Sequence, residues 1–294
     1  MNSFPIIRIP LDAREDTEQL GSKPKFWVLL DGRRWLFKEA RANTGEDWAE
    51  KAAAEIAREM GVVAATVELA EYEGRRGCIS QNFVDVATGE ALIHGNEILA
   101  WTVTGYGKAK TFRQSDHTIE NIQAAMRGLF PEAEAHSVLT VLAGYIVLDA
   151  LIGNTDRHHE NWGLKLHLGS NTPGFQAAPS FDHASSLGRE LLDERRAELL
   201  SEGRVGSYVG KGRGGIFRDS DQRHGENPLR LVQVAARAYP SYFRPALEQV
   251  AALNPERIKS ILAALPQERT SMLAKEFAVA MIFSARTSLI ELLR

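Results

Sequence analysis

The feature that most constrains this chain is an almost wholly apolar run, HSVLTVLAGYIVLDALIG (136–153), followed at once by the polar segment NTDRHHEN (154–161). A helix that is apolar on every side is typical of the buried core of a larger protein. The polar segment must then leave the core at the end of that helix. We therefore predict a core helix that carries a loop rich in Asp, His and Asn at its C-terminal end.

A hairpin is predicted directly after this loop, over residues 163–179, because GLKLHL and FQAAP flank the turn sequence SNTPG. A hairpin returns the chain close to its starting point, so Asp182 should lie near Asn161. These two side chains are oxygen ligands of the kind that Mg²⁺ prefers. Asp156 would be free to orient or deprotonate a hydroxyl, which completes a constellation for phosphoryl transfer. The alternative is a polar loop of helix-capping and turn residues.

The N-terminal part of the chain is predicted to form β-strands. FWVLLDG (26–32) and RRWLFKEA (33–40) are joined at Asp31-Gly32, a strong hairpin signal. A second strand pair is predicted in VVAATVELAEYEG and RRGCISQNFVDV. Residues 1–83 are therefore expected to form a small sheet with one helix.

The helix between the two strand pairs is predicted from about Glu46 to Met60, ending at Gly61. Thr44 and Asp47 resemble a capping box at its start. The positions that share one apolar face at helical spacing are Trp48, Ala52, Ala53, Ile56, Ala57 and Met60.

After Phe83 the predicted elements are mostly helices, among them GNEILAW and HTIENIQAAMRGLF. The expected architecture is α+β and bilobal, with a β-rich N-lobe over 1–83 and a larger helical C-lobe over 84–294. A Gly-rich basic stretch at 203–215 is interpreted as a mobile loop near the substrate or as a plain surface loop.

Composition excludes several classes of protein. The chain has 294 residues, a net charge of −3 and a single cysteine, Cys78. A disulfide framework and a zinc site with two thiolates are excluded, and bulk charge does not favour nucleic acid. No apolar run approaches the roughly 18–20 residues of a membrane span, and the N-terminus lacks a secretory signal. We expect a cytoplasmic protein that binds neither membrane nor nucleic acid directly.

NTDRHHENWGL followed by SFDHASSLG resembles the catalytic and metal-binding loops of the HipA-like serine/threonine protein kinases. These bacterial kinases share a distant fold with the phosphoinositide kinases. The resemblance implies a bilobal kinase fold that uses ATP and Mg²⁺. It assigns Asp156 to catalysis and Asn161 and Asp182 to the metal. His158 would assist catalysis or bond to Asp182 and shape the loop.

The resemblance extends upstream, over roughly residues 20–290. Gly21, Ser22 and Lys23 match that family's Gly-rich loop, and Lys38 matches its ATP-binding lysine. Lys38 also ends an apolar strand, where a lysine can be only an edge residue. Glu50 fits the helix glutamate that pairs with this lysine, although a shift of register would transfer the role to Glu55.

The hinge between the lobes is expected near Gln81-Asn82-Phe83, where backbone groups would hydrogen-bond the adenine. Phe83 is equally well explained as a core residue.

The predicted function is transfer of the ATP γ-phosphate to a Ser or Thr hydroxyl of a protein. The family implies that the substrate is an aminoacyl-tRNA synthetase, that the chain is the toxin of a toxin–antitoxin module, and that Ser22 is an inhibitory autophosphorylation site. Longer HipA-like toxins carry an extra N-terminal subdomain, but only a short stretch precedes Gly21 here, so either a separate small chain would supply that subdomain or the kinase acts alone. A small antitoxin is the other partner that the resemblance implies. The rivals are a lipid or small-molecule kinase and a non-catalytic pseudokinase.

Overall fold

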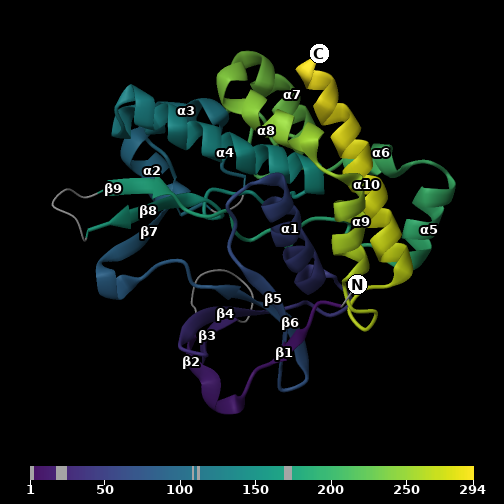
Figure 1. Ribbon diagram of the computed structural model, residues 1–294. Helices are drawn as coiled ribbons and strands as arrows, with labels where there is room; N and C mark the ends of the chain where they lie inside the picture. The colour runs from purple at the N-terminus through teal and green to yellow at the C-terminus, as the bar shows by residue number, and fades with distance from the viewer. Residues whose placement is uncertain (1–2, 18–24, 108, 111–112, 169–173) are drawn as a thin grey trace.

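A β-sheet formed by the N-terminal part of the chain lies against a larger helical region in the computed structural model (Figure 1). The structure describes residues 3–17, 25–107, 109–110, 113–168 and 174–294. This mixed α and β architecture confirms the fold class expected from the sequence. The boundary between lobes at residue 83 stays a prediction.

The N-terminal sheet has six strands in the order β1-β5-β6-β4-β3-β2. β1 is parallel to β5, and the other neighbouring pairs are antiparallel. The strands span β1 Ile6–Arg8, β2 Arg14–Thr17, β3 Lys25–Leu30, β4 Arg33–Glu39, β5 Val67–Tyr72 and β6 Arg75–Gln81.

Both predicted strand pairs are confirmed. β3 and β4 are joined by Asp31 and Gly32, whose φ angles of 49° and 70° are the two positive values that a tight hairpin turn requires. The outer strands β1 and β2 have no counterpart in the prediction, because each is too short to show a clear alternation of apolar residues. The register of the sheet places Lys38 opposite Cys78.

Helix α1 (Glu46–Met60) has the predicted bounds, and Gly61 ends it in the left-handed conformation with φ 81°. All the residues of its predicted apolar face are buried. The capping box is wrong: Gly45 is the N-cap, and the hydroxyl of Thr44 donates to the Arg41 carbonyl. Asp47 is instead buried in a salt bridge with Arg76 and Arg269.

The helical region is built around α4 (Glu132–Ile152), which is the predicted core helix extended at its N-terminal end. It packs against α3, α7, α8 and α10 (Figure 1). The helices around it are α2 Gly95–Thr102, α3 Ile119–Leu129, α5 Asp193–Ser201, α6 Val205–Val209, α7 Pro228–Ala238, α8 Pro240–Ala252, α9 Pro255–Ala263 and α10 Met272–Ile290.

By length and hydropathy alone, α4 is long and apolar enough to cross a membrane, contrary to the expectation that no segment approaches this length. The structure explains its composition, because 78% of its most apolar window is buried inside the fold. Helix α4 is thus the core helix that the sequence predicted.

The hairpin after the polar loop is confirmed as β8 (Gly163–His167) and β9 (Gly174–Ala177). It is part of a three-stranded sheet, because β7 (Glu90–His94) pairs with β8. This strand was not predicted. The Gly-rich stretch is also more ordered than expected, since α6 lies within it.

Truncating Leu148, a fully buried side chain of α4, should destabilise the protein by about 2–5 kcal/mol, because it removes apolar contacts and leaves a cavity. The matched control is Leu129→Ala, since Leu129 is 40% exposed at the end of α3. It should cost less than about 1 kcal/mol. Chemical denaturation would measure both, and equal losses would contradict the core position of α4.

Candidate active site

Arg157 joins the two predicted site loops to the core helix. Its Nε and Nη2 donate to the carboxylate of Asp149, near the end of α4, at 2.7 and 2.8 Å. Its Nη1 donates to the carbonyl of Asn161 in one loop and to the carbonyl of Phe181 in the other. Burial alone would lower the pKa of Arg157, but Asp149 outweighs this and raises it, so the guanidinium stays charged.

Backbone hydrogen bonds hold the same two loops together. The amide of Thr155 donates to the carbonyl of Ser185, and the amide of Leu187 donates to the carbonyl of Ile152. The second loop is also bound to the N-terminal region, because the Ala65 amide donates to the Ser180 carbonyl. The segment around Asp182 therefore bridges the end of α4 and the sheet.

Asp156 and Asn161 occupy opposite ends of one tight loop. The side-chain amide of Asn161 donates to the Asp156 backbone carbonyl at 2.7 Å, so its Oδ1 is the atom left to bind a cation. The Asp156 amide donates to the side chain of Asn154, which is itself bonded to Asp149. Hydrogen bonds through Asn154 thus connect the ion pair of Arg157 and Asp149 to the loop that carries Asp156.

Asp182 lies within salt-bridge distance of Lys38. The Asp182 Oδ1 is 3.0 Å from the Lys38 Nζ, although the two residues are 144 positions apart. The backbone of Asp182 has a φ of 60°, a left-handed conformation that Asp tolerates better than most residues. Burial disfavours the charge on Lys38, but Asp182 and Glu50 outweigh it and raise the lysine pKa.

Glu50 is buried between this salt bridge and His183. Its Oε1 lies 3.8 Å from the His183 Nδ1, too far for a hydrogen bond, and its Oε2 has no partner within the described chain. Burial raises the pKa of Glu50, yet the charge of Lys38, helped by His183, lowers it below its usual value. Glu50 therefore stays ionised beside Lys38.

The rival glutamate on α1 has other partners. Glu55 accepts hydrogen bonds from Lys51 at 2.8 Å and from Arg58 at 2.6 Å. Both of these partners lie on α1 itself. The register of α1 thus brings Glu50 to the charge cluster around Lys38 and directs Glu55 elsewhere.

The remaining predicted site residues belong to three segments. His158 accepts from the Glu160 amide at 3.3 Å, within the loop of Asp156. In the hinge, the amides of Gln81 and Asn82 donate to Thr66 and Arg34, so neither is free for a nucleotide. Phe83 is half-buried, with its ring centroid 5.8 Å from that of Phe181. Gly21, Ser22 and Lys23 lie outside the described residues.

Two cavities flank the loop of Asp156. The first, the catalytic cavity, has a volume of about 410 Å³ and is lined by Arg113, Thr155, Asp156, His158, His159, Arg213, His224 and neighbouring residues. Burial lowers the pKa of His159 to about 4, and that of His117 in the same wall to about 3. Both imidazoles are therefore neutral at pH 7 and add no charge to this cavity.

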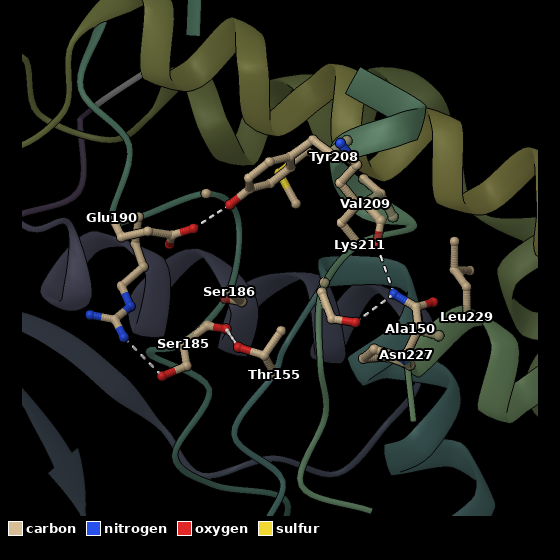
Figure 2. Close-up of a pocket in the computed structure, with 16 residues that line it drawn as sticks. Ala150, Thr155, Ser185, Ser186, Glu190, Tyr208, Val209, Lys211, Asn227 and Leu229 are labelled. Carbon is tan, nitrogen blue, oxygen red and sulfur yellow. Dashed lines mark hydrogen bonds between the residues drawn. The ribbon is translucent and has the colours of Figure 1, made fainter. Parts of the chain in front are cut away.

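The second, the rear cavity, has a volume of about 390 Å³ and shares Thr155 with the first (Figure 2). Polar groups line it in the figure: the Tyr208 hydroxyl donates to the Glu190 carboxylate, and the Thr155 hydroxyl donates to the Ser185 carbonyl. The side chain of Asn227 donates to the carbonyls of Val209 and Gly212 and closes the end of the Gly-rich stretch.

The Gly-rich stretch packs directly on the loop of Asp156. A Cβ on Gly215 would lie 2.7 Å from both the Arg157 carbonyl carbon and the His158 nitrogen, closer than any side chain allows. A Cβ on Gly212 would lie 3.1 Å from the Thr155 Cγ2. Glycine is needed here because two backbones meet, so the stretch is a wall of the site and not a plain surface loop.

Three residues of the site were missed from the sequence. Asp149 and Arg157 form the buried ion pair, and Ser180 bonds to both Arg157 and the His183 Nε2. A carboxylate inside an otherwise apolar helix was the available signal for Asp149, because such a group is buried only with a partner.

Two hard oxygen donors are available for a metal ion in the two site loops. Asn161 Oδ1 and the Asp182 carboxylate are hard oxygen donors, as Mg²⁺ requires. Among the described residues, no group of three or more His, Cys, Asp or Glu side chains forms a metal centre. Two protein ligands are nevertheless sufficient where phosphate oxygens and water complete the coordination, so the donor set fits Mg²⁺ bound with a nucleotide.

The fold is that of the protein-kinase-like enzymes. The structure is similar to that of the Helicobacter pylori proinflammatory kinase CtkA, with a TM-score of 0.80 and 17% identity over 98% of this chain and 96% of that chain. It is also similar to HipA of Shewanella oneidensis MR-1, solved with HipB and operator DNA, with a TM-score of 0.63 and 9% identity over 95% of this chain and 67% of that one.

A match to a family model identifies the family of the chain. The model for the HipA-like C-terminal domain matches residues 19–237, so the chain belongs to this family. No curated protein matches the chain. The resemblance stated from the two loop motifs is therefore confirmed.

Replacing Asp149 by Asn should destabilise the protein by about 3–5 kcal/mol, because it leaves the buried guanidinium of Arg157 without its counter-charge. Asn has nearly the same volume, so the loss would report charge and not packing. Glu198→Gln is the control, since Glu198 pairs with Arg204 on the surface and should change stability little. Wild-type stability of Asp149→Asn in urea would refute the anchoring role.

Proposed function

We propose that this protein is an ATP- and magnesium-dependent kinase that transfers the γ-phosphate to a Ser or Thr hydroxyl of a protein. One observation carries the proposal: the Lys38 ammonium on β4 lies 3.0 Å from the Asp182 carboxylate, whose loop is anchored beside Asp156 and Asn161. A cation, two hard oxygen donors and a further carboxylate thus converge from three segments. Membership of the HipA-like family supports the same chemistry.

Each residue has a distinct role in this proposal. Lys38 binds the α- and β-phosphates, and the unpartnered Oε2 of Glu50 is available to hold the ammonium when it leaves Asp182. Asn161 and Asp182 hold Mg²⁺, which neutralises charge on the phosphates. Gln81 and Phe83 border the adenine, with Gln81 restricted to its carbonyl and side chain. His158 orients the catalytic loop.

Asp156 acts on the acceptor. The hydroxyl oxygen of the substrate forms a bond to the γ-phosphorus while the bond from that phosphorus to the bridging oxygen of ADP breaks. The hydroxyl proton passes to the Asp156 carboxylate. Because the transition state is loose, the carboxylate contributes mainly by orienting the hydroxyl in line with the leaving oxygen.

The substitutions Asp156→Asn and Lys38→Ala should separate transfer from binding. Asp156→Asn should retain ATP affinity and lose most of the phosphate transfer, because it removes an interaction made in the transition state. Lys38→Ala should weaken both ATP binding and transfer. Calorimetric ATP titration and transfer of radiolabelled γ-phosphate to protein acceptors would measure the two effects.

Lys259→Ala is the control, because Lys259 forms a salt bridge with Glu256 on α9 and lines neither cavity beside Asp156. It should leave ATP affinity and transfer close to wild type. Full transfer by Asp156→Asn would overturn the role of that residue. ATP binding without transfer in the wild type would identify a pseudokinase, and transfer to a phosphoinositide alone would identify a lipid kinase.

Ser22 is proposed as a self-inhibitory phosphorylation site on the strength of the family resemblance. A phosphoserine adds about −1.5 to −2 charges at neutral pH, and in the Gly-rich loop it would repel the ATP phosphates. Mass spectrometry after incubation with ATP and Mg²⁺ should find phosphate on Ser22 in the wild type but not in Asp156→Asn. An unmodified Ser22 in an enzyme that phosphorylates another protein would contradict self-inhibition.

The partners are proposed from the same family. The HipA relative was solved with HipB and operator DNA in a toxin–antitoxin system, which supports a small antitoxin partner for this chain. An aminoacyl-tRNA synthetase as substrate rests on the resemblance alone, and a cytoplasmic location stays the expectation stated from the sequence.

A further inference from the structure

The two cavities form one continuous border around Asp156. Both are lined by Thr155 and by parts of the Gly-rich stretch: Lys211 and Gly212 in the rear cavity, and Arg213, Gly214 and Gly215 in the catalytic cavity. The catalytic cavity contains Asp156 itself. A peptide whose hydroxyl reaches Asp156 therefore enters a cavity whose wall includes Arg213.

The charges along this border are mostly positive. Arg113 and Arg213 line the catalytic cavity, and Lys211 lines the rear cavity, where Figure 2 shows it beside Val209. All three are exposed, and none forms an ion pair with another described residue.

In the catalytic cavity, carboxylates do not balance the cations. Asp156 is the only carboxylate among the described residues that line it, against Arg113 and Arg213. In the rear cavity, the exposed carboxylate of Glu190, which accepts a hydrogen bond from Tyr208, offsets the charge of Lys211, and Arg189 is already paired with Glu46. Elsewhere on the surface, exposed arginines such as Arg204 and Arg244 have carboxylate partners. The unpaired cations are thus available to a ligand that reaches Asp156.

We propose that the acceptor is an acidic protein segment, in which the phosphorylated Ser or Thr is flanked by Asp or Glu side chains that contact Arg113, Arg213 and Lys211. This inference deepens the proposed kinase function and rests on it. Complementary charge aligns the segment and excludes basic sequences, because a like charge set against these cations is repelled. The cations are exposed, so salt should weaken the preference.

The test uses the full chain and two peptides that differ only in charge. One has a single serine with Asp and Glu on both sides, and the other has Lys and Arg in their place. Binding is measured by fluorescence anisotropy, and transfer by radiolabelled ATP, each at low and high salt. The variants are Arg213→Glu and, as the matched control, Arg237→Glu, an exposed arginine of α7 that lines neither cavity.

The wild type should prefer the acidic peptide by at least about tenfold in kcat/KM, and less at high salt. Arg213→Glu should lower kcat/KM for the acidic peptide by about tenfold, mainly through KM, and should raise it for the basic peptide. That gain cannot come from misfolding. Arg237→Glu should behave as the wild type.

The outcomes distinguish this inference from the kinase function. Transfer that is indifferent to flanking charge, or unaltered by Arg213→Glu, overturns the inference and leaves the kinase function standing. Arg213-dependent binding of the acidic peptide without any transfer supports the inference about the positively charged border and refutes the kinase function. Single-stranded RNA that binds more tightly than the acidic peptide, with the same dependence on Arg213, overturns the inference.

Discussion

The buried ion pair between Arg157 and Asp149 is the interaction on which the rest of the site depends. One guanidinium bonds to the core helix, to the Asn161 carbonyl and to the Phe181 carbonyl, so three segments are fixed by one side chain. Removing two charges from water is costly, and the attraction between them offsets that cost only with good geometry and additional hydrogen bonds. Here the additional bonds go to the two loops that carry the proposed catalytic and metal-binding residues.

A second set of charges connects these loops to the sheet. Lys38 pairs with Asp182, and Glu50 lies ionised behind them with one oxygen that has no partner. An unsatisfied buried carboxylate oxygen is unfavourable, so this arrangement is poised to change when a new anion or cation enters. In the proposed function, the lysine would exchange Asp182 for phosphate oxygens while Glu50 keeps it in place. This is the physical reason for proposing a nucleotide site at this cluster.

The ion pairs supply the charges of the site, and the Gly-rich stretch supplies part of its shape. At Gly215 its backbone approaches that of Arg157 and His158 more closely than any residue with a Cβ permits. The stretch is therefore a wall shared by two cavities, and it carries Lys211 and Arg213 at their rims. In the proposed function, one surface would bind the nucleotide and another would select the acceptor, and the two surfaces would meet at Asp156.

Local patterns in the sequence determined much of this protein. The Asp31-Gly32 hairpin, helix 46–60, the apolar helix ending at Gly153 and the hairpin beginning at Gly163 all follow from contacts between residues close in the chain. The motif pair around Asp156 and Asp182 was sufficient to identify the family.

Tertiary structure alone decided the rest. The pairing of Lys38 with Asp182, the choice of Glu50 over Glu55, the role of Arg157 and the addition of β7 to the second sheet join residues far apart in sequence. Such partners leave no periodic signal, because burial and charge select them only after the helices and strands have packed. The sequence therefore determined which groups the site contains, and packing decided which of them meet.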